Sequence, residues 1–236
     1  MDCTDLRELP EFIFELLVCR WAELSWPSGD GVPVVGRQVG TRDRRWDTVV
    51  VVADPEGLAA RARFGAEELD RDLLRIVRHA PSEWAWYRDA IPDPGFPWRY
   101  VREAIDRGAA RGIVDRRKRR NRVEIRQITP YPNWVNRIVA VENKPDLDRS
   151  AARRLGEQLE YDVERALADE TWLATGATGD RVEPALLRDI PDKAGILAVS
   201  ADEDGVATAE VAWHPGRLTP DSADLKRRLV VAERVY

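Results

Sequence analysis

The residues best suited to chemistry lie at the end of an apolar segment, residues 137–144, where Glu142 and Lys144 are two positions apart. Side chains alternate along a strand, so this carboxylate and this amine are expected on one face. A second carboxylate, Asp47, opens another apolar segment, residues 45–52. Carboxylate oxygens can hold Mg²⁺, while an ammonium beside them can steer a water or offset charge on a phosphate. This combination indicates metal-dependent phosphodiester hydrolysis.

The segments around these residues follow a recognisable order. An amphipathic helix is expected over residues 9–24, before the Asp47 strand. After the Glu142 strand comes a polar helix, then strand-like segments at 170–175 and 190–199. In this order the chain resembles the restriction-endonuclease-like superfamily, the PD-(D/E)xK nucleases, especially their DNA-repair and RecB-like branches. The resemblance covers about residues 8–54 and 136–215.

The resemblance implies roles for particular residues. Asp47 and Glu142 would be the ligands of Mg²⁺ or Mn²⁺, and Lys144 would position water or stabilise the transition state. Glu15, on the first helix, would be a further metal ligand. The alternative for Glu15 is an acid on the solvent-facing side of that helix.

The polar helix carries Gln158 and Tyr161, which the resemblance places with the catalytic residues. They are three positions apart, where the RecB-like pattern has four, but this spacing still leaves both on one helix face. Pro145 follows Lys144 directly, which restricts Lys144 to an extended conformation and marks the end of the strand.

A block over residues 55–135 is not needed by a minimal nuclease core. Helices are expected over 69–79 and 97–108, with another helix start near residues 84–87. Strands at 112–114 and 122–128 would then flank a basic loop. Helices followed by a basic hairpin resemble a winged helix, in which one helix enters a DNA groove and the wing touches the phosphate backbone. The candidate nucleic-acid-binding residues are Arg116, Arg117, Lys118, Arg119, Arg120 and Arg122.

Charge is distributed unevenly along the chain. Residues 99–126 contain eleven basic and four acidic residues, a net charge of +7 in a chain of net charge −5, which leaves about −12 elsewhere. A basic region on an acidic protein is typical of nucleic-acid binding. The alternative is that these arginines pair with the protein's own acids. Trp84 and Trp86 could stack on bases, although packing in the core is the preferred interpretation.

Composition sets limits on these interpretations. The chain has 236 residues, 44% hydrophobic and 33% charged, which suits one large domain or a core with an insert. Its two cysteines and two histidines lack the spacing of a structural zinc site. The apolar runs are too short to cross a bilayer and no signal peptide is evident, so a cytoplasmic protein is expected. Arginine dominates the 37 basic residues, only four of which are lysines, and the 42 acids outnumber them, which suggests a GC-rich, salt-adapted source such as a halophilic archaeon.

The predicted fold is α/β, a restriction-endonuclease-like core with a mixed central sheet flanked by helices and an inserted winged-helix-like α+β subdomain. Residues 1–54 and 136–236 would form the core, and residues 55–135 the insertion. The predicted function is Mg²⁺-dependent hydrolysis of DNA in repair or processing, with DNA as partner, no membrane, and homodimerisation left open. Two alternatives are a non-catalytic DNA-binding or regulatory protein on a nuclease-like fold, and an interaction protein that binds no nucleic acid.

Overall fold

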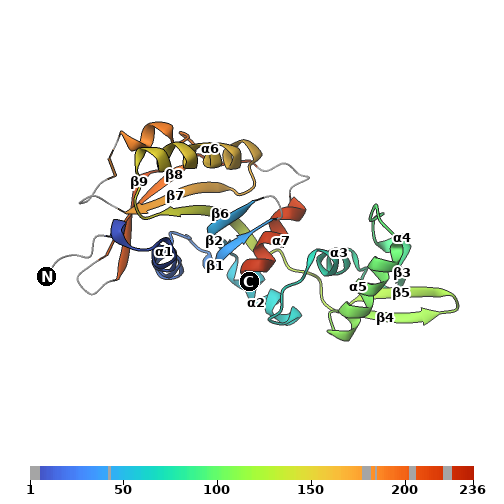
Figure 1. The fold of residues 1–236 in the computed structure, drawn as a ribbon. Coiled ribbons are helices and arrows are strands. Elements are labelled where there is room, and N and C mark those ends of the chain that lie inside the picture. The colour runs from blue at the N-terminus through green and yellow to red at the C-terminus, as the bar shows by residue number, and fades with distance from the viewer. Residues whose placement is uncertain (1–5, 42–43, 177–181, 184, 202–205, 220–224) are drawn as a thin grey trace. The chain divides into compact units, whose positions relative to one another are not determined.

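The computed structural model describes residues 6–41, 44–176, 182–183, 185–201, 206–219 and 225–236. The chain forms two compact units (Figure 1). Met1–Asp54 and Val135–Tyr236 make up the first, called the core unit, and Pro55–Trp134 make up the second, called the inserted unit.

The core unit is built on a six-stranded sheet in the order β1-β2-β6-β7-β8-β9. The parallel pairs are β6 with β7 and β7 with β8, and the other neighbours are antiparallel. The prediction of an α/β protein with a mixed central sheet flanked by helices is therefore confirmed. The strands are β1 (Val32–Gly40), β2 (Arg45–Ala53), β6 (Val135–Lys144), β7 (Glu170–Gly176), β8 (Gly195–Ala201) and β9 (Ala207–Trp213).

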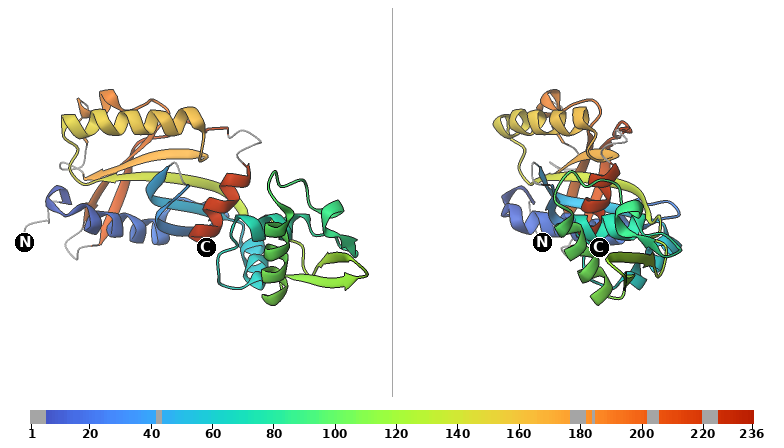
Figure 2. Two further views of the ribbon diagram at one scale, coloured as in Figure 1. Left: turned by 45° about the vertical axis from the view of Figure 1, so that its right-hand side comes forward. Right: turned by 90° about the vertical axis from the view of Figure 1, so that its right-hand side faces the viewer.

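Helices cover both faces of this sheet. The core-unit helices are α1 (Glu11–Ser25), α6 (Arg149–Arg165) and α7 (Leu225–Val235), with short 3-10 turns at η1 (Leu6–Glu8) and η3 (Leu186–Asp189). Both views of Figure 2 show α1 and α6 on opposite faces of the sheet. Because helices cover both faces of the sheet, both sides of the inner strands are buried. This explains why the sequences of these strands are almost continuously apolar.

Alternation along the strands assigns each side chain to one helix layer. Val50 and Val139 pack with Phe14 of α1, and all three are fully buried. On the other face, Leu173 of β7 packs against Leu159 of α6. Each large apolar side chain buried in this way stabilises the fold by about 1.5–3 kcal/mol.

The inserted unit has its own hydrophobic core around Ile76, Ile105 and Ile125. A three-stranded antiparallel sheet in the order β3-β5-β4 lies beside its helices. Its elements are α2 (Pro55–Arg61), η2 (Ala62–Phe64), α3 (Arg71–His79), β3 (Ala85–Trp86), α4 (Tyr87–Ala90), α5 (Trp98–Ala110), β4 (Val114–Arg119) and β5 (Arg122–Gln127).

The chain leaves the core unit after Asp54 and re-enters it at Val135, and Ala53, the residue before Asp54, is the partner of Val135 in the β2/β6 ladder. The two ends of the insertion are therefore adjacent. Chain ends that lie close together are what allow one domain to be inserted into another.

The structure corrects several local predictions. The expected helix start at residues 84–87 is a two-residue strand, β3, followed by the four-residue helix α4. The basic run 115–119, expected as a loop, continues strand β4, because its residues pair with β5 and leave only Arg120 and Asn121 to turn. Strand β9 and helix α2 were not predicted. The sequence also predicts a final helix over residues 220–236; residues 220–224 lie outside the described residues, and α7 is described from Leu225.

Helix α6 packs closely on η3 at Gly156, and this packing yields a stability prediction. A Cβ at Gly156 would lie 2.0 Å from the backbone oxygen of Asp189. Alanine normally favours a helix over glycine by about 1 kcal/mol. Here we expect Gly156→Ala to lower the free energy of unfolding by about 1–3 kcal/mol, because the backbone must move apart.

Urea denaturation followed by circular dichroism measures this change. Gly216→Ala is a matched control, since its Cβ would first meet Cγ of Lys193, at 3.1 Å on a flexible side chain. Equal stability of Gly156→Ala and the wild type would contradict the close packing of α6 on η3.

Candidate functional site

Antiparallel pairing brings Asp47 and Glu142 together. Thr48 of β2 is the partner of Val141 of β6, so Asp47 and Glu142 follow at the next step of the two strands. Oδ2 of Asp47 accepts a hydrogen bond of 2.9 Å from the backbone N–H of Asn143. The two acids that sequence analysis selected from distant segments therefore lie at one end of adjacent strands.

Gln38 joins Asp47 to Glu15. Its Nε2 donates to Oδ1 of Asp47 at 3.0 Å and to Oε1 of Glu15 at 2.9 Å. Gln38 has φ of +56°, and the β1/β2 ladder passes from Arg37 to Val39 without it. A left-handed residue that is not glycine inside a strand is strained, and such strain persists only where surrounding contacts hold it.

Glu15 is buried and faces this network. Besides Gln38, Arg37 binds it, with Nη1 2.9 Å from Oε2. The alternative of a solvent-facing acid on α1 is therefore wrong. Glu15 and Asp47 do not bond to each other directly. The Gln38 amide bridges the two carboxylates and fixes both in place.

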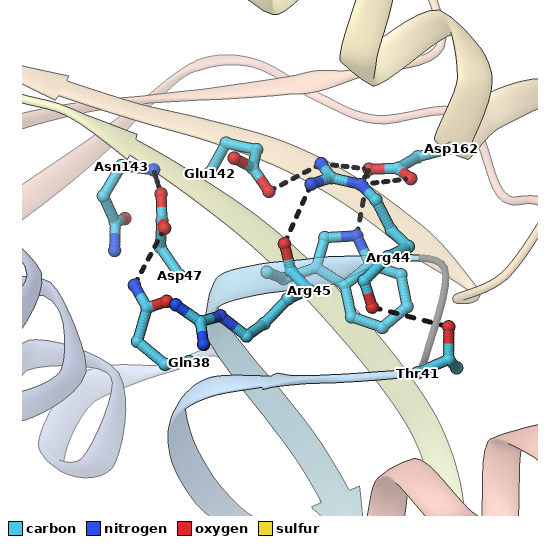
Figure 3. A network of polar contacts seen from close by, with 9 residues as sticks. Gln38, Thr41, Arg44, Arg45, Asp47, Glu142, Asn143 and Asp162 are labelled. Atoms are coloured by element: carbon cyan, nitrogen blue, oxygen red, sulfur yellow. Dashed lines mark hydrogen bonds and ion pairs between the residues drawn. The ribbon is translucent and has the colours of Figure 1, made fainter.

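Glu142 belongs to a second network, shown in Figure 3. Nη2 of Arg44 donates to Oε1 of Glu142 at 2.7 Å and to Oδ2 of Asp162 at 2.8 Å. Nε of Arg44 also donates to Asp162 at 2.9 Å, and Trp46 Nε1 donates to the same carboxylate at 2.9 Å. Asp162 is 1% exposed and Glu142 is 6% exposed, so Arg44 supplies the positive charge for two buried acids.

Burial and neighbouring charges shift the ionisation of the two acids. Burial raises the pKa of Glu142 to about 8, with Asp47 and Asp162 adding to the rise and Arg44 opposing it. Burial also raises the pKa of Asp47, where Glu15 adds to the rise while the Asn143 N–H and the Gln38 amide oppose it. Negative charge is therefore costly at this end of the sheet, and a cation close to Asp47 and Glu142 would be stabilised.

Lys144 is the last residue of β6, and its ammonium pairs with the carboxylate of Glu11 on α1. Glu142 and Lys144 do not pair with each other, because Glu142 binds Arg44 and Lys144 binds Glu11. The Lys144 side chain remains 23% exposed and that of its partner Glu11 is 58% exposed. A weak surface pair of this kind can be exchanged for another anion at little cost.

Gln158 and Tyr161 lie on the exposed side of α6 and make no hydrogen bond with Asp47, Glu142 or Lys144 in the described part of the chain. They line a hollow of about 500 Å³ next to Arg44. The complete lining is Arg44, Arg45, Arg154, Glu157, Gln158 and Tyr161. The two residues therefore border the site through Arg44.

Sequence analysis missed Gln38, Arg44 and Asp162. Asp162 had a detectable signal, since it follows Leu155 and Leu159 at helical spacing on the buried side of α6. An acid on such a face needs a partner. Neither Gln38, within β1, nor Arg44, just before β2, lies in a pattern that distinguishes it from other polar residues near strands.

The basic residues of the β4/β5 hairpin fall into two groups. Arg116 pairs with Asp106 at 2.8 Å and Arg117 with Glu124 at 2.7 Å, while Arg122 lies over the Trp86 ring. The other three predicted residues are at the tip. Lys118, Arg119 and Arg120 are exposed, and among the described residues none of them has an acidic partner.

The sequence profile of a family of unknown function, DUF5787, matches residues 34–235. The chain belongs to this family. The match spans both units and includes Gln38, Arg44, Asp47, Glu142 and Asp162, whereas Glu15 lies before it. No curated protein and no solved structure gives a significant match. Within the described ranges, no helix has the length and apolar character needed to span a membrane.

The acids of the site suit a cation that needs few protein ligands. Among the residues that the structure describes, no three His, Cys, Asp or Glu side chains gather as a metal site. Mg²⁺ is commonly bound through one or two carboxylates, with waters and substrate phosphates completing its shell. Asp47 and Glu142 would be the two carboxylates. Both oxygens of Asp47 already accept hydrogen bonds, whereas Oε2 of Glu142 accepts none from the described chain (Figure 3).

The raised pKa of Glu142 predicts a pH-dependent stability. Its pKa is about 8 in the folded chain and ordinarily 4.5, so the folded state holds this proton more tightly. The resulting stabilisation is complete below pH 4.5 and is lost as pH rises towards 8. We expect Glu142→Gln to remove much of this loss, on the order of a few kcal/mol, at about 1.4 kcal/mol for each pKa unit.

The measurement is the free energy of unfolding from about pH 5 to about pH 9 in buffer with EDTA, a range that spans the titration of a carboxyl group with a raised pKa. Glu160→Gln, an exposed change on α6, is the control and should follow the wild type. If Glu142→Gln also loses stability as steeply as the wild type over this range, Glu142 is not the group responsible.

Proposed function

We propose that this protein is a Mg²⁺-dependent nuclease that hydrolyses phosphodiester bonds in DNA, in repair or processing. The observation that carries the proposal is the placement of Asp47 and Glu142 at the same end of the paired strands β2 and β6, one step beyond the Thr48–Val141 pair, with Lys144 two residues further on. Within the core unit, with the inserted elements between β2 and β6 left aside, the order is α1, β1, β2, β6, α6 and β7. This order supports a restriction-endonuclease-like core, since it is the order that the sequence resemblance implies.

In this proposal Asp47 and Glu142 hold the metal, which when bound acidifies a water and polarises the phosphate. The protein's own residues prepare the site. The Asn143 N–H and the Gln38 amide fix the Asp47 carboxylate, and Gln38 ties Glu15 to it. Glu15 then acts as a support for Asp47 or as a further ligand.

In this mechanism Arg44 neutralises the charge of Glu142, and Lys144 neutralises charge on the phosphate. Arg44 offsets the negative charge of Glu142 and has Asp162 as a second partner, with which it makes more hydrogen bonds. It can therefore release Glu142 to a cation while keeping a buried ion pair. Lys144 would leave Glu11 for the phosphate and stabilise charge as the bond breaks.

The inserted unit is proposed to supply DNA affinity in the manner of a winged helix. Helices α3 and α5 are followed by the β4/β5 hairpin, and β3 pairs with β5. A helix would contact a groove while the hairpin tip, Lys118 to Arg120, contacts backbone phosphates. The three exposed cations at the tip support this role.

The first test uses wild type and Glu142→Ala with labelled linear duplex, single-stranded and branched DNA, in Mg²⁺, Mn²⁺ or EDTA. The proposal expects metal-dependent cleavage by wild type alone. Cleavage that persists in Glu142→Ala would place the active site elsewhere, and absence of cleavage under every condition would remove the nuclease.

Lys144→Ala should separate cleavage from binding. We expect the rate of cleavage to fall by about 100-fold or more, as for the loss of one charge-stabilising donor, while DNA affinity stays within about twofold. Single-turnover cleavage and fluorescence anisotropy measure the two quantities. Lys193→Ala, in the core unit but away from the site, is the matched control. A parallel loss of affinity and rate would assign Lys144 to binding.

Removing the tip charges should act on binding at any sequence. Changing Lys118, Arg119 and Arg120 to Gln should weaken DNA affinity and flatten its salt dependence, by about 0.9 in slope for every duplex phosphate that the tip no longer neutralises. The control removes three exposed positive charges from the core unit, at Arg20, Arg153 and Arg188. Equally weakened binding by both triple variants would mean that net charge, not the tip, determines affinity.

A second candidate function is a DNA-binding or regulatory protein that keeps this fold without catalysis. Two observations favour it: Arg44 forms an ion pair with Oε1 of Glu142, and Glu11 forms an ion pair with Lys144, so both proposed catalytic residues already have partners. In that case Arg44 would be a permanent counter-ion. Mn²⁺ titration distinguishes the two, because a nuclease site binds the ion through Asp47 and Glu142, whereas the alternative predicts DNA binding with no carboxylate-dependent metal binding.

A further inference from the structure

The three-stranded sheet of the inserted unit has one apolar face and one charged face. Val114, Val123 and Ile125 point into the hydrophobic core of the unit. Residues directly opposite in a ladder share a face, so the β4/β5 register and the Trp86–Glu124 pair define the other side. This outer face carries Trp86, Asp115, Arg117, Arg119, Arg122, Glu124 and Arg126.

Like charges meet at the end of the outer face. Arg119 is the ladder partner of Arg122, and Arg120 follows in the turn with φ of +54°. Like charges directly opposite one another destabilise a sheet. All three arginines are exposed, and in the described part of the chain no acid pairs with them. An anionic partner would relieve this repulsion.

Two tryptophans lie against the arginines of the outer face. The guanidinium carbon of Arg117 is 4.2 Å from the ring centroid of Trp84, and that of Arg126 is 4.9 Å from it. The guanidinium of Arg122 is 4.7 Å from the Trp86 centroid. These distances are within the range of cation–π attraction.

Two of these arginines, Arg117 and Arg126, are held from a second side by acids. Nε of Arg117 donates to Glu124 at 2.7 Å, and Arg126 binds Asp115 through Nε and Nη2. The side chains of Arg117 and Arg126 nevertheless remain 43% and 41% exposed. Each guanidinium is therefore fixed by a ring and a carboxylate. Nη1 and Nη2 of Arg117, and Nη1 of Arg126, still have hydrogen atoms that they can donate to an external acceptor.

We propose that Trp84 and Trp86 are positioning residues, and that the outer face binds the phosphodiester backbone of nucleic acid without reading its bases. The rings hold Arg117, Arg126 and Arg122 in fixed directions, which reduces the conformational entropy lost when the planar guanidinium binds a phosphate. Each ring already has a guanidinium over it, and Trp86 also packs against the hydrophobic core of the unit, which favours a positioning role over stacking on bases. This inference rests on the proposed function only in taking DNA as the partner.

The test separates guanidinium position from charge. Full-length Arg117→Lys and Arg122→Lys keep the net charge but lose the planar donor, and Trp84→Leu loses the ring. Each is expected to weaken binding, by about tenfold for Trp84→Leu because two arginines are freed, with little change in salt slope. Trp213→Leu, at an exposed tryptophan on β9 of the core unit, is the control and should bind as wild type.

Anisotropy is measured in EDTA with dA and dT homopolymers and with duplex DNA. Equal affinity for the two homopolymers is expected, since the contacts are to the backbone. A strong base preference that Trp84→Leu abolishes would show stacking on bases and overturn the inference. Wild-type affinity in the lysine variants would also overturn it. If Trp84→Leu fails to fold, Trp84→Phe and the lysine variants decide the matter.

Competitors identify the chemistry of the partner. Inorganic polyphosphate should displace DNA more effectively than polyglutamate of equal charge. The guanidinium fork fits both phosphate and carboxylate, so this comparison tests which anion the spacing of these arginines favours. Equal competition by polyglutamate would assign the face to acidic proteins. If the wild type binds DNA but never cuts it, only the nuclease proposal fails. If the wild type cuts DNA and the variants bind DNA as tightly as the wild type, only this inference fails.

Discussion

The pairing of β2 with β6 is the interaction on which the rest of the structure depends. It joins two segments that the inserted unit separates in sequence, and it links the antiparallel β1/β2 part of the sheet to the parallel β6/β7/β8 part. The ladder runs from Thr48 with Val141 to Ala53 with Val135. One end of it brings Asp47 beside Glu142, and the other end receives both ends of the insertion.

The second constraint is the burial of negative charge at the first of these ends. Glu142 and Asp162 are buried and Asp47 is partly buried, and the charges of Asp47 and Asp162 raise the pKa of Glu142. Arg44 offsets the cost of this burial by bridging Glu142 and Asp162, and Gln38 does so by bridging Asp47 and Glu15. The left-handed backbone of Gln38 shows that this arrangement has a conformational cost. A structure that holds its acids in this way is prepared for a cation, whether a metal ion or Arg44 itself.

The inserted unit carries an excess of positive charge, which is spread unevenly over its β4/β5 hairpin. Most arginines on its hairpin strands are paired with an acid, stacked on a tryptophan, or both, while positive charge without partners gathers at the tip in the described part of the chain. The excess of positive charge that the sequence shows over residues 99–126 is therefore reduced along the strands and concentrated at one end. Both interpretations of the basic run, self-pairing and an open cationic surface, describe part of the same hairpin.

The sequence by itself determined the mixed α/β character of the core unit and the strands that carry Asp47 and Glu142, because apolar runs bounded by polar turns have few other ways to be buried. It could not place β3, which has two residues, or β9 and most of β4, which are largely exposed and form only because a partner strand supplies their hydrogen bonds. Only the tertiary structure decided that Arg44 and Asp162 belong to the site, that Glu15 faces inward, and that Lys144 pairs with Glu11. These are contacts between residues far apart in the chain, and long polar side chains choose partners according to which charges the fold buries nearby.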